Sequence, residues 1–458
     1  MKVYGLEYFE KERNNIVKAL STLIQYDTSN PPGNELEAAK YVGELLREIG
    51  LKPEVIESFK GRGNVIARIG DGEPSLLLLS HLDVVPVERG EEWKHPPFSG
   101  AIAEGYVWGR GALDCKGLTI MELYALKAFL ESDIPFKGTI IFASTADEEK
   151  GGKAGVGWLV DKYPEKVRAT YVINEGGGLI AKMRRRTIAL IQTAEKGVYW
   201  VKIKVRGRSA HGSIPKMGEN AIERAYQLIN MLKTRVEVER VDEPTKSFLK
   251  NIAKASAGSL ASTLISLKPF RKIVLREIAK REPKQYAFID AMLRNTLTPT
   301  KINAGVKENV IPAYCELICD VRLLPSFNED FVLNEFKNVS SKLGVKAELE
   351  FLTREPASKS NINTPLFDAI KKSLREVYGN VIITPFMTTG GTDSRYFRWK
   401  FNSVAYGFMP YYTESLQDIL ARIHGKNERI NIRELVRGCY ALYKTLVYFF
   451  TEYSSYSS

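Results

Sequence analysis

Cysteine, histidine and long apolar runs are scarce in this chain. Its 458 residues include four cysteines and four histidines. So few cysteines in a chain of this length argue against a disulfide framework, and no cysteine spacing of the zinc-ribbon type occurs. No apolar stretch approaches the roughly 20 residues that span a bilayer. Any bound metal must therefore be held mainly by oxygen and nitrogen ligands.

Charged residues interrupt Met1–Arg13 and leave it without an apolar core, so we expect no secretory leader. We therefore expect a cytoplasmic protein with no membrane partner. The net charge of +12 is compatible with an anionic partner. However, the basic residues read as spread along the chain and are not interleaved with aromatic residues, and the densest basic run, Lys182–Arg186, reads as a solvated turn. We expect no nucleic-acid partner.

Alternating short apolar runs and amphipathic segments predict an α/β fold, with a mostly parallel sheet flanked by helices. Strands are expected at about 64–69, 75–80, 138–144 and 169–174, and helices at about 14–24, 35–49 and 116–130. Near residue 196 the pattern changes to that of half-buried antiparallel strands, and after Pro365 the α/β pattern resumes. We therefore predict one domain of residues 1–195 and 358–458, with an inserted α+β domain of residues 196–357.

A histidine and an aspartate follow the apolar run Leu76–Leu79, which has the character of a fully buried parallel strand. His81 and Asp83 would emerge at its carboxyl end, where ligands bind in open α/β sheets. Because they are two residues apart in extended chain, they point the same way, which suits a metal ligand with a carboxylate behind it. Taken alone, a structural histidine beside a loop aspartate explains the pair equally well.

More acids, and a second histidine, stand at the ends of predicted strands or the starts of helices. They are Asp114, Glu148, Glu149, Glu175 and His424. If the acids converge at one sheet edge, their mutual repulsion requires cations. Two divalent ions held by two histidines and three carboxylates, one carboxylate bridging, would meet this need and leave a position for water. Each acid alone reads as a solvated loop residue, but these four acids together with Asp83 make five at equivalent positions, which favours the metal site.

These segments resemble those of the M20 family of metallopeptidases and amidohydrolases, in the family's order and over nearly the whole chain, from Thr28–Gly33 to His424–Glu428. The resemblance implies a catalytic domain with two Zn²⁺ and an inserted lid and dimerisation domain. Co²⁺ or Mn²⁺ would suit the same oxygen and nitrogen ligands. It also implies a cis peptide bond between Asp114 and Cys115.

The resemblance also implies a role for each residue of this set. One zinc would be held by His81, Asp114 and Glu175, and the other by Asp114, Glu149 and His424. Asp83 would orient His81, and Glu148 would be the general base. Hydroxide formed from a water shared by the two ions would attack an amide carbonyl, and Glu148 would pass the proton on to the leaving nitrogen.

Further candidates lie outside this set. The resemblance gives His211, in Arg208–Ser213, the task of stabilising the oxyanion in the neighbouring subunit's site, so we expect a homodimer joined through the inserted domain. Arg322 and Arg395 could grip a substrate carboxylate, although surface ion pairing explains each equally well. Other substrate-binding candidates are Asn309, Gly391 and Thr392.

The substrate is expected to be a small molecule, a peptide or an N-acyl amino acid. The segment 303–312 resembles carboxypeptidase S-like and N-acyl amino acid hydrolase members, which favours cleavage of an amide or peptide bond next to a carboxylate-bearing amino acid. A dedicated biosynthetic deacylase, such as succinyl-diaminopimelate desuccinylase or acetylornithine deacetylase, is the alternative. A non-catalytic binding protein on the same fold would be expected to lack a metal ligand or the base, and this chain has them all.

Overall fold

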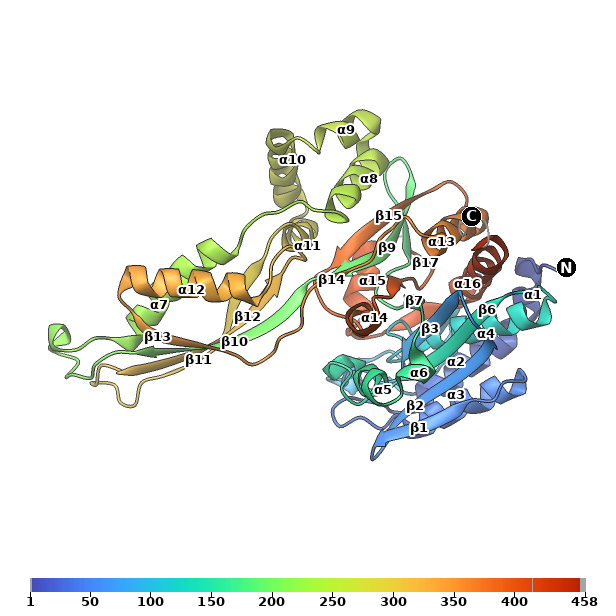
Figure 1. Cartoon of the computed structure of the whole chain (residues 1–458), viewed down its shortest axis with the longest axis horizontal. Helices are drawn as coiled ribbons and strands as arrows, with labels where there is room; N and C mark the ends of the chain where they lie inside the picture. Colours follow the sequence, from blue (N-terminus) through green and yellow to red (C-terminus); the bar gives the residue numbers. More distant parts are fainter. Residues whose placement is uncertain (1, 414, 454–458) are drawn as a thin grey trace.

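A large twisted β-sheet forms the centre of the α/β body in the computed structural model, which describes residues 2–413 and 415–453 (Figure 1). In sheet order its strands are β1 (Glu54–Phe59), β2 (Arg62–Asp71), β6 (Gly138–Thr145), β3 (Ser75–His81), β7 (Tyr171–Asn174), β16 (Val404–Gly407), β9 (Thr187–Glu195), β8 (Leu179–Lys182) and β17 (Tyr411–Thr413). Two more strands, β14 (Ser358–Lys359) and β15 (Val381–Thr388), pair with β9. The neighbours β6, β3, β7 and β16 are parallel, so their carboxyl ends meet at one edge.

Helices cover both faces of this sheet, and the fold confirms the predicted α/β class. One face packs on α1 (Leu6–Lys11), α2 (Arg13–Gln25), α3 (Leu36–Glu48), α4 (Lys116–Glu131), α13 (Pro365–Tyr378) and α16 (Ile432–Glu452). The other packs on α5 (Val156–Lys162), α6 (Pro164–Val167) and α14 (Ser394–Phe401). Along β3, Leu76 and Leu78 enter the first core and Leu77 and Leu79 the second. Every residue of β3 is buried, because both of its faces are covered.

An elongated arm extends from the body and holds a four-stranded antiparallel sheet (Figure 1). Its strands, in order, are β11 (Thr296–Ala304), β12 (Tyr314–Leu323), β10 (Gly197–Arg206) and β13 (Lys346–Phe351), and its helices are α7 (Ala221–Val236) and α12 (Glu329–Leu343). Alternate residues of β10 and β12, among them Val201, Ile203, Cys315 and Cys319, form the core with these helices. This is the half-buried pattern that the sequence predicts for these strands.

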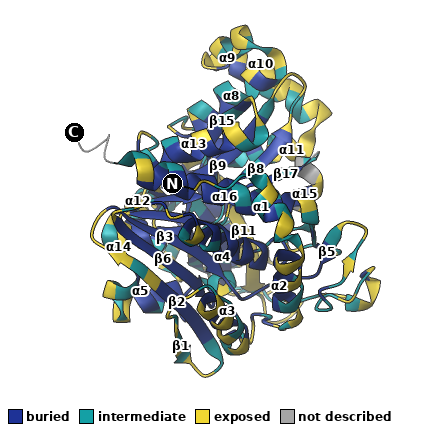
Figure 2. Ribbon diagram, turned by 90° about the vertical axis from the view of Figure 1, so that its right-hand side faces the viewer, coloured by how far each residue is buried: buried dark blue, intermediate teal, exposed yellow. Residues whose placement is uncertain are grey.

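Four further helices lie between α7 and β11 in the sequence: α8 (Thr245–Ala257), α9 (Ser259–Leu264), α10 (Lys268–Arg281) and α11 (Pro283–Leu293). They pack against the body rather than along the arm, since Phe248 and Leu249 of α8 share a core with Ile188 of β9 and Phe386 of β15. In Figures 1 and 2, α9 and α10 stand clear of the sheet, with much of their surface exposed. The predicted module 196–357 thus comprises the arm sheet together with a helical group seated on the body.

Two segments far apart in the sequence meet in a small third sheet. Its strands are β18 (Arg429–Asn431), β5 (Tyr106–Trp108) and β4 (Ile102–Ala103). This sheet brings the segment before β18, with His424, next to the segment after β5, with Asp114. Within the described residues no helix combines the length and apolar character needed to cross a bilayer.

Candidate metal centre

Loops at the carboxyl edge of the parallel strands present the predicted metal ligands. His81 is the last residue of β3, and Glu148 and Glu149 lie in a single 3₁₀ turn that follows β6. Glu175 follows β7 directly, and Asp114 lies two residues before α4. The backbone thus gathers these side chains because the ends of parallel strands share one edge.

The Asp114 carboxylate stands between the two histidines. Its Oδ1 lies 3.0 Å from His81 Nε2, and its Oδ2 lies 3.0 Å from His424 Nε2. Glu149 Oε1 lies 3.3 Å from the same His424 nitrogen. Ligand atoms of His81, Asp114 and Glu149 all lie within 4.8 Å of one another, which is a spacing suited to a metal ion. One carboxylate oxygen facing each histidine is the arrangement that a bridging ligand needs.

The peptide bond between Asp114 and Cys115 is cis, as the family resemblance implies. Cys115 itself is buried, and its Sγ accepts a hydrogen bond from the backbone N–H of His81 at 3.1 Å. Burial raises the pKa of its thiol to about 12, so Cys115 is an uncharged packing residue rather than a thiolate ligand.

Asp83 is buried and supports the predicted ligands through hydrogen bonds. The His81 Nδ1–H donates to the Asp83 backbone oxygen at 2.9 Å, which leaves Nε2 facing Asp114. The Asp83 carboxylate accepts the backbone N–H groups of Glu148 and Glu149 at 3.0 and 3.1 Å. Burial acts to raise the pKa of Asp83, but hydrogen bonds from His81, from the Asn30 amide and from Glu149 lower it below its ordinary value. One buried aspartate therefore positions one predicted ligand ring and the turn that bears the predicted base.

Two acids near Asp114, Glu175 and Glu148, have raised pKa values. Burial, followed by repulsion from Asp114, raises the pKa of Glu175 to about 8. Burial also raises the pKa of Glu148 well above its ordinary value, with the carboxylates of Glu175 and Asp393 adding to the shift. Raised pKa values of this kind mark a place where negative charge is crowded and where a cation would relieve the repulsion.

The donor set fits divalent metal ions by its chemistry. Glu149 Oε1 is buried and, among the described residues, accepts no hydrogen bond of regular geometry, which leaves its lone pairs available. Imidazole and carboxylate ligands suit zinc, cobalt or manganese, and neither cysteine nor methionine is needed.

A buried ion pair joins the two segments that carry Asp114 and His424. Arg110 Nη1 donates to Glu428 Oε2 at 2.7 Å, and neither side chain is more than 3% exposed. Glu428 Oε1 accepts the backbone N–H groups of Leu113 and Asp114, while Arg110 Nη2 donates to the His424 carbonyl at 3.1 Å. The pair therefore fixes the backbone on both sides of the bridging position.

Three predicted substrate-binding residues lie close together in the chain, Gly391 and Thr392 in the loop before α14 and Arg395 in the first turn of that helix. Arg395 is buried and donates to the Gly151 carbonyl at 3.2 Å, and its Nη1 lies 3.6 Å from Glu355. A side chain on Gly391 would collide with the Arg395 guanidinium, so this glycine leaves the arginine its space. The Thr392 hydroxyl donates a buried hydrogen bond to the Glu195 carboxylate.

Arg322 lies on strand β12 of the arm and forms an ion pair with a residue of the same strand. Its guanidinium donates twice to Asp320, at 2.7 and 2.9 Å, which is the ion-pair alternative left open by the sequence. Its role in substrate binding stays a prediction.

His211 and Asn309 lie together near the far end of the arm. His211 forms an isolated antiparallel bridge with Val310, and Gly212 donates its N–H to the Asn309 carbonyl at 2.7 Å. The side chains of His211 and Asn309 are both exposed. The strand β10 that leads to His211 has ten residues, so His211 lies about 30 Å beyond the body. Neither residue therefore reaches the metal centre of its own chain.

Sequence reasoning missed several supporting residues. Asn30 donates to Asp83 at 2.8 Å and to Asp147 at 3.1 Å, and Arg62 pairs with both Asp147 and Glu35. Glu428 belongs to the segment His424–Glu428 that carries the family resemblance, and Arg110 lies four residues before the predicted ligand Asp114. A signal was therefore present for that pair, although nothing in the sequence says that the two residues meet.

Comparisons with known proteins agree with this geometry. The profile of peptidase family M20/M25/M40 matches residues 77–448. The chain is 28% identical to the N-fatty-acyl-amino acid synthase/hydrolase PM20D1.1 of Danio rerio over 84% of this chain and 74% of that protein. It is 27% identical to a probable succinyl-diaminopimelate desuccinylase of Staphylococcus aureus, over 85% of this chain and 87% of that protein.

Among solved structures, an M20 family metallo-carboxypeptidase from Sulfolobus solfataricus matches with a TM-score of 0.67 and 21% identity, over 96% of this chain and 99% of that one. This likeness confirms the fold. The family profile covers most of the chain, and the resemblance inferred from the sequence is confirmed. The chain belongs to peptidase family M20/M25/M40, and it is a metal-dependent enzyme that hydrolyses an amide or peptide bond.

Proposed function

We propose that the enzyme uses two divalent metal ions, zinc in the first instance, to release an amino acid from a peptide or an N-acyl amino acid. One ion would be held by His81, Asp114 and Glu175, and the second by Asp114, Glu149 and His424. The observation that carries this proposal is the Asp114 carboxylate, which directs one oxygen to each histidine at 3.0 Å. Metal ions bound there would polarise the scissile carbonyl and make a bound water acidic.

The chain's own residues would supply proton transfer. Glu148 has a raised pKa because it is buried among other acids, so it suits a group that takes and returns a proton near neutral pH. Asp83 fixes the backbone of Glu148 through the 3.0 Å hydrogen bond. We infer that Glu148 accepts a proton from the attacking water and delivers it to the leaving nitrogen.

Arg395 would bind the substrate carboxylate. It is buried beside the Glu148 loop, and its Nε has no hydrogen-bond partner among the described residues. A guanidinium in this position can make paired hydrogen bonds to a carboxylate. The resemblance of 303–312 to acyl amino acid hydrolases favours a broad peptidase or N-acyl amino acid hydrolase. Since one relative is named a probable succinyl-diaminopimelate desuccinylase, a dedicated deacylase is the second candidate.

A substrate panel separates the two candidates and tests Glu148 in the same assay. N-acyl amino acids, N-succinyl-diaminopimelate and dipeptides with free or amidated carboxyl termini would be compared. We expect several N-acyl amino acids or dipeptides to be cleaved, with the amidated dipeptides poor substrates. Hydrolysis of the succinyl compound alone would favour the deacylase.

On the best substrate, Glu148→Gln should keep its metal and lose about 10² to 10⁴ in kcat. Near wild-type turnover by metal-loaded Glu148→Gln would remove Glu148 from this role.

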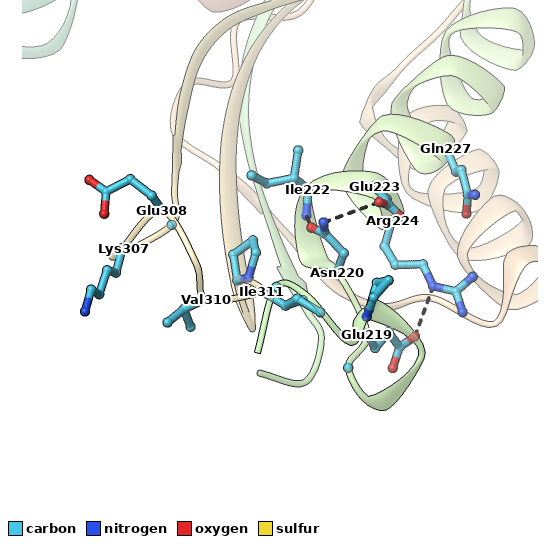
Figure 3. A pocket seen from close by; sticks show the side chains of 15 residues that line it. Glu219, Asn220, Ile222, Glu223, Arg224, Gln227, Lys307, Glu308, Val310 and Ile311 are labelled. Atoms are coloured by element: carbon cyan, nitrogen blue, oxygen red, sulfur yellow. Dashed lines mark hydrogen bonds and ion pairs between the residues drawn. The ribbon is translucent and has the colours of Figure 1, made fainter. Parts of the chain in front are cut away.

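We further propose a homodimer in which His211 of one chain completes the other chain's site. The position of His211, about 30 Å along the arm, supports this arrangement because it is remote from the chain's own metal centre. A pocket of about 600 Å³ lies beside it, lined by parts of the segments 212–227 and 305–312 (Figure 3). Ion-paired Glu219 and Arg224 and the exposed Lys307 and Glu308 give this end of the arm a polar, charged surface.

Mixing two inactive variants tests the cross-subunit role. His211→Ala and Glu148→Gln would each be nearly inactive alone. When subunits exchange, half of the dimers become mixed and each has one intact site, so activity should return to about a quarter of the wild-type value. If His211 acts within its own chain, mixing will restore nothing, and if it has no role, His211→Ala will be active on its own.

A further inference from the structure

The positive charge of the protein is concentrated in one place. The segment Lys182–Arg186 and the helices α8–α10, residues 245–281, together contain 13 Lys and Arg and a single acid, Glu277. The whole chain contains 66 basic and 54 acidic residues, so the other 416 residues hold 53 of each and are neutral. The net charge of +12 therefore resides in these two segments. This corrects the expectation that the basic residues are spread along the chain without a cluster beyond Lys182–Arg186.

These two segments are neighbours in space. Arg185, in the turn between β8 and β9, donates its backbone N–H to the Ala255 carbonyl of α8 at 3.0 Å. An added side chain on Gly258, between α8 and α9, would lie 3.2 Å from Arg185 Nη1. We name this combined region, residues 182–186 and 245–281, the basic shoulder. Figure 1 shows its helices on the side of the body from which the arm departs.

Large apolar side chains are exposed on the same surface. Leu260 is 74% exposed and Ile273 is 59% exposed, and Leu267, Phe270 and Val274 are each more than 40% exposed. Figure 2 shows the exposed surface of α9 and α10 at the edge of the molecule. Side chains of this size seldom gather on a free surface unless something covers them.

Helix α10 arranges these residues in an orderly way. Its inward face bears Arg271, which is buried and pairs with Glu239 at 3.1 Å. At 100° per residue, Phe270, Ile273 and Val274 lie 60° to 160° from Arg271 round one side of the helix, and Lys268, Lys272 and Arg276 lie 60° to 140° from it round the other. Among the described residues, no acid lies within ion-pair distance of those three cations. The exposed surface of α10 therefore offers unpaired positive charge beside apolar side chains.

We propose that the basic shoulder is a peripheral docking surface for an anionic lipid membrane. The cations match lipid phosphates, and the apolar side chains match the hydrocarbon just below them. A polyphosphate or nucleic acid would satisfy the charge but leave Phe270, Ile273 and Val274 in water. A pocket of about 300 Å³ lined by Lys182, Arg185 and Arg186 has a size and charge suited to one lipid phosphate group. The proposal departs from the expectation, drawn from the sequence, that no membrane takes part.

Vesicle co-sedimentation of the full chain tests the proposal. We expect binding to vesicles of equal parts phosphatidylglycerol and phosphatidylcholine, little binding to phosphatidylcholine alone, and a decrease with salt. The variant Lys268→Gln/Lys272→Gln/Arg276→Gln should bind roughly 100-fold more weakly at low salt. The variant Phe270→Ser/Ile273→Ser/Val274→Ser, which keeps every charge, should also bind at least about 10-fold more weakly.

Matched controls lie elsewhere on the surface. Phe59, Ile102 and Val3 are exposed residues of the same three types on the α/β body, and Lys337, Lys342 and Lys346 are exposed on the arm. Changing these to Ser or to Gln should leave vesicle binding within about twofold of wild type, because they lie outside the shoulder. Thermal unfolding and hydrolysis of a soluble substrate, unchanged in the shoulder variants, would show that each variant is folded.

Three results would overturn the proposal. The first is no binding of the wild-type chain to anionic vesicles. The second is binding that the apolar variant retains in full, which would mean that the shoulder holds polyanions by charge alone. The third is self-association through the shoulder, seen as a sedimentation shift that the apolar variant abolishes, without vesicle binding. That last outcome would make the shoulder an interface between copies of this chain.

Discussion

Single residues at the strand ends could be predicted with their chemistry. His81 and Asp83 stand two apart after a buried strand, and the structure places them as a ring and a carboxylate in contact, with Nδ1 of His81 3.5 Å from Oδ1 of Asp83. The periodicity of an extended chain is enough to predict this. The further hydrogen bonds that Asp83 accepts from Glu148, Glu149 and Asn30 were not predictable, since they depend on the path of loops far apart in the sequence.

One buried acid, Glu122, makes the stability of the folded protein depend on pH. Glu122 of α4 is fully buried, and neither carboxylate oxygen has a hydrogen bond of regular geometry among the described residues. Burial raises the pKa of Glu122 well above its ordinary value of 4.5, while contacts with Ser80 and Leu79 oppose the shift. The folded state therefore keeps this proton where the unfolded state has lost it, so stability falls as pH rises above 4.5.

Glu122→Gln should remove this penalty. We expect the variant to be more stable than wild type at neutral pH, because the amide is never charged. Its advantage should shrink by up to about 1.4 kcal/mol for each pH unit on the way down to 4.5. Urea unfolding of both proteins at several pH values would measure this, with Glu44→Gln on the exposed side of α3 as control. An advantage that does not change with pH would contradict the assignment.

At the scale of elements, the pairing of distant segments decides the site. The strand ends were predictable because β3, β6 and β7 read as parallel strands, whereas His424 follows none of these strands and its position beside them did not follow from their pattern. The structure brings it in through β18, which pairs with β5, and through the Arg110–Glu428 ion pair across 318 residues of sequence. Contacts of such separation leave no local pattern, so this part of the site could not be derived from periodicity.

The Arg110–Glu428 pair should position the second metal ligand. Glu428→Gln would leave the buried Arg110 guanidinium without a counter-charge. The new amide N–H₂ would also face the N–H donors of Arg110 or of Leu113 and Asp114, which Glu428 now accepts. We expect a loss of about 3 kcal/mol in the free energy of unfolding and a weaker affinity for metal, since His424 and Asp114 lose their common anchor. Chemical denaturation and metal titration measure the two effects.

A double-mutant cycle gives the control for this pair. In Arg110→Met/Glu428→Gln both charges are removed, so the double variant should be more stable than the sum of the single losses predicts. Strictly additive losses would mean that the two side chains act independently.

The whole molecule separates three tasks. The α/β body holds the metal ligands, the arm holds His211 and Asn309 away from them, and the basic shoulder holds the net charge. The α/β body and the arm strands were predictable from hydrophobic patterning. The seating of α8–α11 on β9 and β15 was not, because an amphipathic helix shows that it has a buried face but not which surface covers it.

Metal content measured together with activity tests the central claim most directly. The purified chain would be analysed by mass spectrometry of its metals during stepwise removal by a chelator and stepwise return of Zn²⁺. The account predicts two divalent ions per chain, loss of hydrolysis as they are removed and recovery as they return, with Asp114→Asn failing to recover. A folded chain that hydrolyses its substrate equally well after all divalent metal has been removed would contradict the account.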